Sequence, residues 1–201
     1  MEIYLNSLAL TGTAEAAPEL SHSNHGEKFF VFPLGVRRLS GQTDRINVVI
    51  AEEKLALVSP SARLHVTGQL RSYNNRSGKG SRLVITALAR TIEPDDTGED
   101  SNEITLGGAI CKAPTLRRTP LGRDICDVML AVNRPYGRAD YLPCIAWGAI
   151  AARVAERTVG KTLKLEGRVQ SRRYSKATET GTEERTAFEV SVMRLIEPED
   201  D

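Results

Sequence analysis

The chain has 201 residues, of which 40% are hydrophobic and 26% charged, a composition typical of folded domains rather than of disordered or membrane-spanning chains. No run approaches the roughly 18 apolar residues of a spanning helix, and the first residues lack the basic region of a secretory signal. Three widely spaced cysteines, Cys111, Cys126 and Cys144, indicate neither a disulfide framework nor a zinc site and favour a reducing, cytoplasmic setting.

Two parts of the chain are similar to each other. Asn6–Gly12 matches Asn102–Gly108 at an offset of 96 residues, and Val66–Ser72 matches Leu165–Ser171 at an offset of 99. Because the similar segments follow in the same order, two copies of one domain are the simplest explanation. We therefore predict domains at 1–94 and 103–197, joined by an acidic linker at 95–102 and followed by a short acidic tail at 198–201.

Short runs rich in Val, Ile, Leu and Thr, bounded by Gly, Pro and Asn, predict strands in both copies. In the second copy they fall near 103–112, 124–134, 140–147, 162–174 and 186–196. The alanine-rich segment 148–160 predicts a helix closed by Gly160. Three strands, a helix and two strands is the order of an oligonucleotide/oligosaccharide-binding (OB) barrel. The predicted fold is all-β, with two tandem five-stranded Greek-key OB barrels, each carrying one short helix between strands 3 and 4.

The formal net charge of +1 hides an uneven distribution. Residues 1–92 carry a net charge of +4 and residues 104–194 a net charge of +7, whereas segment 93–103 holds six acidic residues and the last five residues hold four. Of the 27 basic residues, 20 are Arg, which pairs with phosphate in a bidentate manner and stacks on planar rings. This distribution favours a nucleic-acid partner, although arginines also occur on solvated faces without a ligand.

Aromatic side chains are interleaved with cations in the second copy. Strand alternation over 140–147 predicts two faces, one with Leu142, Cys144 and Ala146 and the other with Tyr141, Pro143, Ile145 and Trp147. Tyr136 and Tyr174 lie in polar, arginine-rich segments. Base stacking on exposed rings, at about 1–3 kcal/mol per base, together with cations along the phosphates is what sequence-independent binding of single strands requires. The alternative is that Tyr141 and Trp147 pack under a loop or at a subunit interface.

Motifs of the second copy follow a recognisable order: Ala113-Pro-Thr-Leu-Arg117-Arg-Thr119, Leu130-Ala-Val-Asn133-Arg134, Ile145-Ala-Trp147-Gly148, Gly160-Lys161 and Leu165-Glu-Gly167-Arg-Val-Gln-Ser171-Arg-Arg-Tyr174. This order resembles the bacterial single-stranded DNA-binding protein family. The resemblance implies non-sequence-specific binding and protection of single-stranded DNA in replication, recombination or repair, in the cytoplasm at the nucleoid. The stacking aromatics of the family fall on Tyr136, Tyr141, Trp147 and Tyr174, which the residue pattern also singles out.

Phosphate contacts are predicted at Arg117, Arg118, Arg134, Arg138, Arg168, Arg172, Arg173 and Lys176. The first copy departs from the family pattern, because Ala51, Arg45 and approximately Ser40 stand where Trp147, Tyr141 and Tyr136 stand in the second. It keeps one candidate stacking residue, Tyr73, and the cations Arg37, Arg38, Arg45, Arg71, Arg76 and Lys79. Phosphate or assembly contacts are expected of this degenerate copy, and a purely structural role is an equal alternative.

The sequence predicts no catalytic site, no metal site and no cofactor. His22 and His25 are expected in a polar surface loop without a third ligand. Gly78-Lys-Gly-Ser81 lacks the full spacing of a phosphate-binding loop. No Ser/His/Asp or Cys/His set is found for nucleophilic catalysis.

The resemblance also implies an assembly. Family members commonly combine four single barrels, so a chain with two is expected to form a homodimer. The acidic end lacks the long linker and terminal aromatic that recruit replication and repair proteins in many members. Two alternatives remain: a primosome-type or mobile-element accessory protein that uses its barrels mainly for protein assembly, and an RNA-binding protein.

Overall fold

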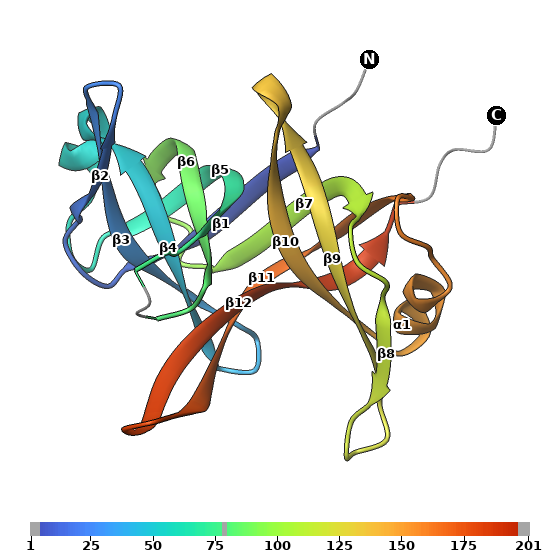
Figure 1. Cartoon of the computed structure of the whole chain (residues 1–201). Helices are drawn as coiled ribbons and strands as arrows, with labels where there is room; N and C mark the ends of the chain where they lie inside the picture. The colour runs from blue at the N-terminus through green and yellow to red at the C-terminus, as the bar shows by residue number, and fades with distance from the viewer. Residues whose placement is uncertain (1–4, 78–79, 197–201) are drawn as a thin grey trace. The chain divides into compact units, whose positions relative to one another are not determined.

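The computed structural model describes residues 5–77 and 80–196 (Figure 1). Its strands are β1 (Asn6–Ala14), β2 (Glu19–Asn24), β3 (Glu27–Arg37), β4 (Thr43–Ala51), β5 (Arg63–Asn74), β6 (Leu83–Pro94), β7 (Ser101–Ile110), β8 (Thr115–Arg118), β9 (Asp124–Arg134), β10 (Arg138–Trp147), β11 (Thr162–Thr178) and β12 (Gly181–Leu195). Its helical segments are the 3₁₀ turns η1 (Glu52–Leu57) and η2 (Pro135–Gly137) and the α-helix α1 (Gly148–Ala155). None of the described helices is long and apolar enough to cross a membrane. The all-β prediction is confirmed.

Each half of the chain closes five strands into a ring. In the first half the pairing order is β3-β4-β6-β5-β1, and β1 returns to pair with β3 at Thr13–Gly35. In the second half the order is β7-β11-β12-β10-β9, and β9 returns to β7 at Ala109–Ala131. This order gives the five-stranded Greek-key topology of an OB barrel. The structure adds β2 and β8, short strands paired outside the rings with β3 and β9, which the sequence did not predict.

The glycines that recur in the two copies occupy equivalent tight places. A Cβ on Gly68 would collide with the backbone oxygen of Leu88, and a Cβ on Gly167 would collide with that of Ser191. Both glycines lie on the strand that follows the helical segment, and each collision is with the last strand of its copy. A side chain is excluded because the neighbouring backbone lies against the Cα atom. The repeated glycine is therefore explained by strand packing.

The face of β10 that was predicted to be apolar is the core of the second copy. Leu142, Cys144 and Ala146 are fully buried, which confirms the strand alternation. Burial raises the pKa of the Cys144 thiol far above its usual range. On the opposite face the ends of the strand are open at Tyr141 and Trp147, whereas Ile145 between them is buried.

The helical segments are shorter than predicted. α1 ends at Ala155, five residues before Gly160, and the backbone N–H of Gly160, at φ +86°, donates to the carbonyl oxygen of Ile110. The corresponding segment of the first copy is the single 3₁₀ stretch η1. Both segments lie between the third and fourth ring strands of their copies, and the one in the first copy has 3₁₀ geometry.

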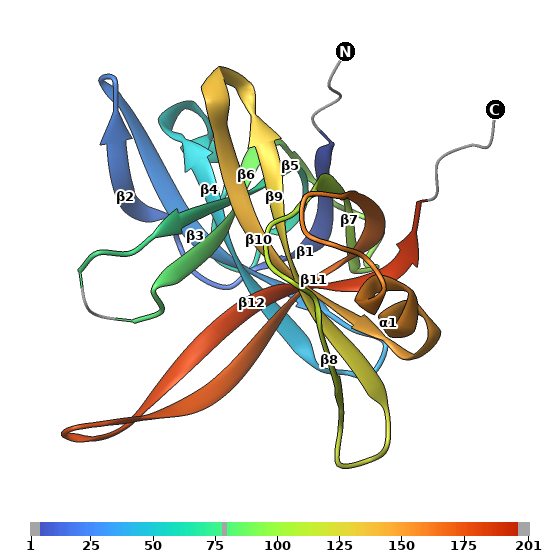
Figure 2. The ribbon, with the colours of Figure 1, turned by 45° about the vertical axis from the view of Figure 1, so that its right-hand side comes forward.

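The chain forms two compact units whose limits cross the repeat. One unit comprises Ser7–Arg71 and Ile85–Glu103, and the other comprises Met1–Asn6, Ser72–Val84 and Ile104–Asp201. The end of the β5–β6 hairpin, within Ser72–Val84, thus lies in the same unit as the second barrel. In this second unit β11 and β12 form a long hairpin. The two strands pair with each other from Leu165–Leu195 to Thr178–Gly181, and Figure 2 shows the far part of the hairpin as a separate two-stranded ribbon.

The acidic segment after β6 forms ion pairs and a hydrogen bond with other residues of the unit that comprises Ser7–Arg71 and Ile85–Glu103. Arg63 forms ion pairs with Asp95 at 2.9 Å and with Asp100 at 2.7 Å, and the backbone N–H of Arg37 donates to the Asp100 carboxylate at 2.7 Å. The Thr97 side chain and the Arg63 guanidinium hold the pKa of Asp95 below its usual value. The expected linker therefore contributes partners for cations of its own unit.

His22 departs from expectation. It lies in β2 rather than in a loop, and its ring stacks on Phe29 with centroids 4.9 Å apart and an angle of 7° between the planes. The strand forms because β2 pairs with the long β3, whose residues 29–34 are all apolar. Only His25, at φ 49°, lies in the turn as expected. No group of three metal-binding side chains is found within residues 5–77 and 80–196.

Candidate nucleic-acid interface

The register of the strands places the predicted residues of the second copy on one face of the sheet. Trp147 pairs with Ile125, which pairs with Arg117 of β8. Two residues away on β10, Ile145 pairs with Ser191, which pairs with Arg168 of β11. Residues directly opposite in a sheet project to the same side, and so do residues two apart along a strand. The shared face contains Tyr141, Trp147, Arg117, Arg168, Arg172, Tyr174 and Lys176, whereas Arg173 projects to the other face.

The aromatic rings of this face are accessible in different degrees. Trp147 exposes 39% of its surface and Tyr141 50%. Tyr136 lies in η2, between β9 and β10, and is fully exposed in a left-handed backbone conformation with φ 66°. A tyrosine without a packing partner at such a position has no role in the core, and its ring is available for contact with a ligand.

Tyr174 is already in contact with cations. The Arg172 guanidinium lies over the ring at 5.7 Å from its centroid, and Arg185 is the directly opposite residue on β12. Arg185 also pairs with Glu183 at 2.8 Å, and the hydrogen bond to this carboxylate raises the pKa of the guanidinium. The ribbon β11–β12 therefore presents a half-buried ring between two positive groups.

Arg134 is held by a buried carboxylate. Asp140 is completely buried and lies 2.8 Å from the guanidinium Nε of Arg134. The backbone N–H of Ser72 donates to the same carboxylate at 2.7 Å, the Ser72 hydroxyl accepts from the backbone N–H of Tyr141 at 2.7 Å, and the Ser72 carbonyl accepts from Arg134 at 3.4 Å. These bonds fix the start of β10 next to Tyr141.

The same ion pair occurs in the first copy at an offset of 96 residues. The guanidinium of Arg38 binds the completely buried Asp44 through two bonds of 2.6 Å. The repetition at equivalent places of both barrels assigns these pairs to the framework of the fold. Two predicted phosphate contacts, Arg38 and Arg134, thus have an internal carboxylate partner.

Arg117 and Arg118 also have acidic neighbours, but at the surface. Arg117 pairs with Asp127 at 2.6 Å and Arg118 with Asp124 at 2.8 Å, and all four side chains are at least 40% exposed. The hydrogen bond from Arg118 holds the pKa of Asp124 below its usual value. Exposed pairs of this kind contribute only about 0–1 kcal/mol, so a phosphate can compete for either arginine.

Four predicted cations of the second copy have no acidic partner within the described residues, namely Arg138, Arg172, Arg173 and Lys176. All four are exposed. Arg168 is different, because its Nε atom is buried and has no hydrogen-bond partner among the described residues. The open cations thus concentrate on the ribbon and next to Tyr136.

The first copy places its predicted residues less uniformly. Tyr73 is 56% exposed near the end of β5. Arg45, at the position of Tyr141, forms an ion pair with Glu15 at 2.7 Å, and Ala51, at the position of Trp147, is half-buried. Arg37 and Arg76 are exposed and Arg71 is half-buried, whereas Lys79 lies outside the described residues.

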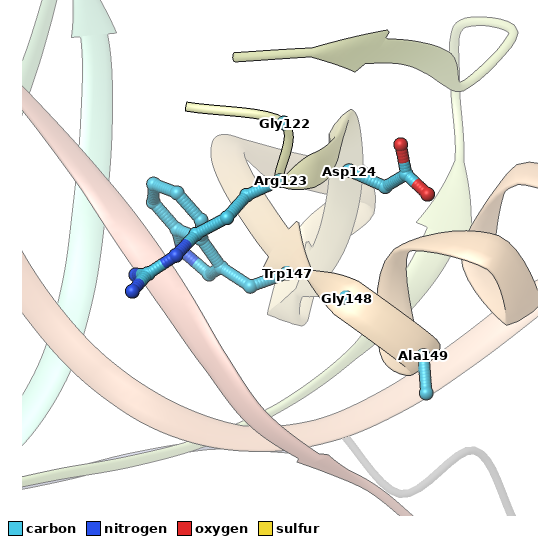
Figure 3. A pocket seen from close by; sticks show the side chains of 6 residues that line it. All are labelled: Gly122, Arg123, Asp124, Trp147, Gly148 and Ala149. Atoms are coloured by element: carbon cyan, nitrogen blue, oxygen red, sulfur yellow. The ribbon is translucent and has the colours of Figure 1, made fainter. Parts of the chain in front are cut away.

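A pocket of about 610 Å³ lies beside Trp147 (Figure 3). Its lining consists of Gly122, Arg123, Asp124, Trp147, Gly148 and Ala149. Figure 3 shows the side chains of Arg123 and Trp147 extending in the same direction and the Asp124 carboxylate pointing away from them. Sequence reasoning missed Arg123, although its spacing from Ile125 in β9 indicates the face that carries Trp147.

The comparison with known families decides the relationship of this copy. A model of the Single-strand binding protein family matches residues 101–196. This part of the chain is similar to that family in sequence. The resemblance inferred from the motifs is confirmed, and the matched residues contain the four predicted stacking aromatics of the second copy.

Curated relatives named single-stranded DNA-binding proteins match part of the chain. Single-stranded DNA-binding protein 3 of Listeria innocua is 38% identical over an alignment of 80 residues that covers 36% of this chain and 50% of the relative. The single-stranded DNA-binding protein of Halalkalibacterium halodurans is 33% identical over an alignment of 108 residues that covers 48% of this chain and 61% of the relative. The chain thus spans about half the length of the curated relatives it matches.

A solved structure of the single-strand binding protein type extends the similarity to both copies. The crystal structure of the wild-type single-stranded DNA binding protein from Thermus aquaticus superimposes with a TM-score of 0.78 and 23% identity. The match covers 98% of this chain and 94% of that chain. At this identity the comparison shows a common fold alone, and it extends to both copies.

Proposed function

We propose that this chain is a non-enzymatic protein that binds single-stranded DNA without strong sequence preference. One observation supports the proposal: strand register puts the partly exposed rings of Trp147, Tyr141 and Tyr174 and several cations on one face of the sheet, in the copy that matches the single-strand binding protein family. Stacking rings accept any base, and cations along the sheet neutralise successive phosphates. Such binding would protect single strands during replication, recombination or repair.

The cations divide into two roles. Arg172 and Lys176 are the main phosphate contacts of this face, since they are exposed and have no acidic partner within the described residues. Arg138 and Arg173 are also exposed and lack an acidic partner there, but Arg173 projects to the other face, so it contacts phosphate only where the strand passes around the ribbon. Arg117 and Arg118 join them by exchanging a surface carboxylate for a phosphate. Arg134 instead shapes the site, because its buried partner Asp140 would be left uncompensated if it moved to the DNA.

The first copy contributes charge more than stacking. Its framework keeps the Arg38–Asp44 pair, whereas the positions equivalent to Trp147 and Tyr141 hold Ala51 and Arg45. Its exposed residues Arg37, Arg76 and Tyr73 are the contacts we assign to it. Two such chains in a homodimer would present four OB copies, and a solution mass of a single chain at micromolar concentration contradicts this part of the proposal.

The decisive experiment titrates a labelled oligo-dT strand into the protein at several salt concentrations. Binding should quench the fluorescence of Trp147, the only tryptophan, and the logarithm of the affinity should fall with the logarithm of salt at about 0.7 per phosphate contact. Duplex DNA of the same length serves as the control. Equal affinity for duplex and single strand, or binding that does not respond to salt, contradicts the proposal.

A matched pair of variants tests the stacking role, with anisotropy of the labelled strand as the readout. Trp147→Phe keeps an aromatic face and should bind nearly as well as the wild type. Trp147→Leu keeps an apolar side chain without that face and should lose about 1–3 kcal/mol of binding energy. Competition by an RNA oligomer of the same sequence distinguishes DNA binding from RNA binding.

A further inference from the structure

The pocket beside Trp147 is lined by a cation, Arg123, that the sequence did not predict as a phosphate contact. Arg123 is exposed, lines the pocket and has no acidic partner within the described residues. The one carboxylate in the lining, Asp124, is bound by Arg118 from outside the pocket, at 2.8 and 3.4 Å. Asp124 is therefore compensated without Arg123, whose charge is available to a ligand.

The backbone holds Arg123 in place. Its N–H donates to the Thr119 hydroxyl at 3.0 Å, and its carbonyl accepts from the backbone N–H of Thr119 at 2.8 Å. Gly122 completes the turn at φ +80°, which glycine adopts without strain. A contact at the end of such a closed turn costs less ordering entropy than one from an unrestrained loop.

The pocket has the size and chemistry of a nucleotide site. Its volume of about 610 Å³ falls within the range of roughly 300–1,000 Å³ that is common for small-ligand pockets. An added Cβ on Gly122 or Gly148 would meet no atom within 4 Å, so the space beside Trp147 is unfilled. An indole and a guanidinium around one pocket match the two parts of a nucleotide, a planar base and a charged phosphate.

We propose that Arg123 binds the phosphate of the nucleotide whose base stacks on Trp147. This inference rests on the proposed function and adds to it a contact specific to the β8–β9 turn. Arg123 precedes β9 by one residue and lies two residues before Ile125, the cross-strand partner of Trp147. The phosphate-binding side chain and the stacking ring thus lie at one end of the same sheet face.

The experiment measures the salt dependence of oligo-dT binding for Arg123 variants. Arg123→Gln should weaken binding about tenfold at low salt, as expected for one lost charge-assisted bond, and make the salt slope shallower by about 0.7. Arg123→Lys keeps the charge and should retain most of the affinity and the slope. Arg194→Gln removes one charge from a pair with Glu166 outside the pocket and should bind like the wild type.

A second variant tests the pocket without removing Arg123. Ala149→Glu introduces a carboxylate into the lining at the first turn of α1, where an anion favours the helix. It should lower the affinity for oligo-dT at least as much as Arg123→Gln, while the unfolding midpoint stays at or above that of the wild type.

The outcomes separate this inference from the proposed function. If the wild type binds single strands with quenching and salt dependence but Arg123→Gln binds identically, the Arg123 contact is wrong and the function stands. The contact is also wrong if Arg123→Lys loses as much affinity as Arg123→Gln, or if Arg194→Gln changes the slope equally. Absence of salt-dependent binding in the wild type overturns both proposals.

Discussion

Removal of the buried carboxylate of Asp140 should destabilise the second barrel severely. Asp140→Ala leaves the Arg134 guanidinium without its partner and the Ser72 N–H without its acceptor. Loss of one member of a buried ion pair costs about 3–5 kcal/mol. Because Arg134 keeps 26% of its side-chain exposure, water compensates part of the loss, and we expect about 2–4 kcal/mol.

Urea unfolding followed by Trp147 fluorescence is the suitable assay, since Trp147 lies in the same compact unit as Asp140. The matched control is Asp127→Ala, which breaks an ion pair with Arg117 whose side chains are 43% and 53% exposed, and it should cost at most about 1 kcal/mol. Equal destabilisation by the two variants would refute the structural importance of the buried pair. Asp140→Asn keeps an acceptor for Ser72 and should lie between them.

Three further predictions concern single residues. Gly167→Ala should lower the free energy of unfolding by about 1–3 kcal/mol, because its Cβ forces neighbouring backbone apart, and an unchanged urea midpoint contradicts this. Arg118→Ala should raise the pKa of Asp124 towards its usual value, which NMR titration of the carboxyl group checks. In the wild type the folded-state pKa of Asp124 is lowered. The pair therefore stabilises the fold above the unfolded-state pKa, and this stabilisation is lost as the pH falls through the folded-state pKa. Cys144, whose burial raises the pKa of its thiol, should react with thiol reagents only after unfolding. The half-buried Cys111 should react in the native protein. Equal reaction rates of the two thiols in the native protein would be inconsistent with the structure.

Local sequence patterns predicted the main strands and the repeat. Alternation over 140–147 separated Leu142 and Cys144 from Tyr141 and Trp147, because side chains project to alternate sides of a strand. The match of the segments that contain Gly68 and Gly167 predicted the repeat, and the structure gives the packing reason for these glycines. The short strands β2 and β8 were missed, since their residues are exposed and carry no apolar alternation.

The partners of the cations could not be predicted from the sequence. Arg134 and Asp140 are six residues apart across a turn, and only the closed sheet shows that the carboxylate is buried. Ser72, which completes this cluster, comes from the other copy of the repeat, 68 residues before Asp140. Cationic residues look alike in sequence whether they compensate a buried acid, as Arg134 does, or face solvent, as Arg138 does.

The twin pairs Arg38–Asp44 and Arg134–Asp140 have an evolutionary consequence. In a duplicated domain, loss of either member of such a pair leaves a buried charge uncompensated, which is a physical reason for both copies to keep it. Positions on the outer face carry no such penalty. The equivalent positions of the two copies can therefore hold residues as different as Ala51 and Trp147 while both barrels keep the same framework. Aromatic residues could therefore be introduced on the outer face of the first barrel. Such substitutions would create a second stacking surface without a change in the core.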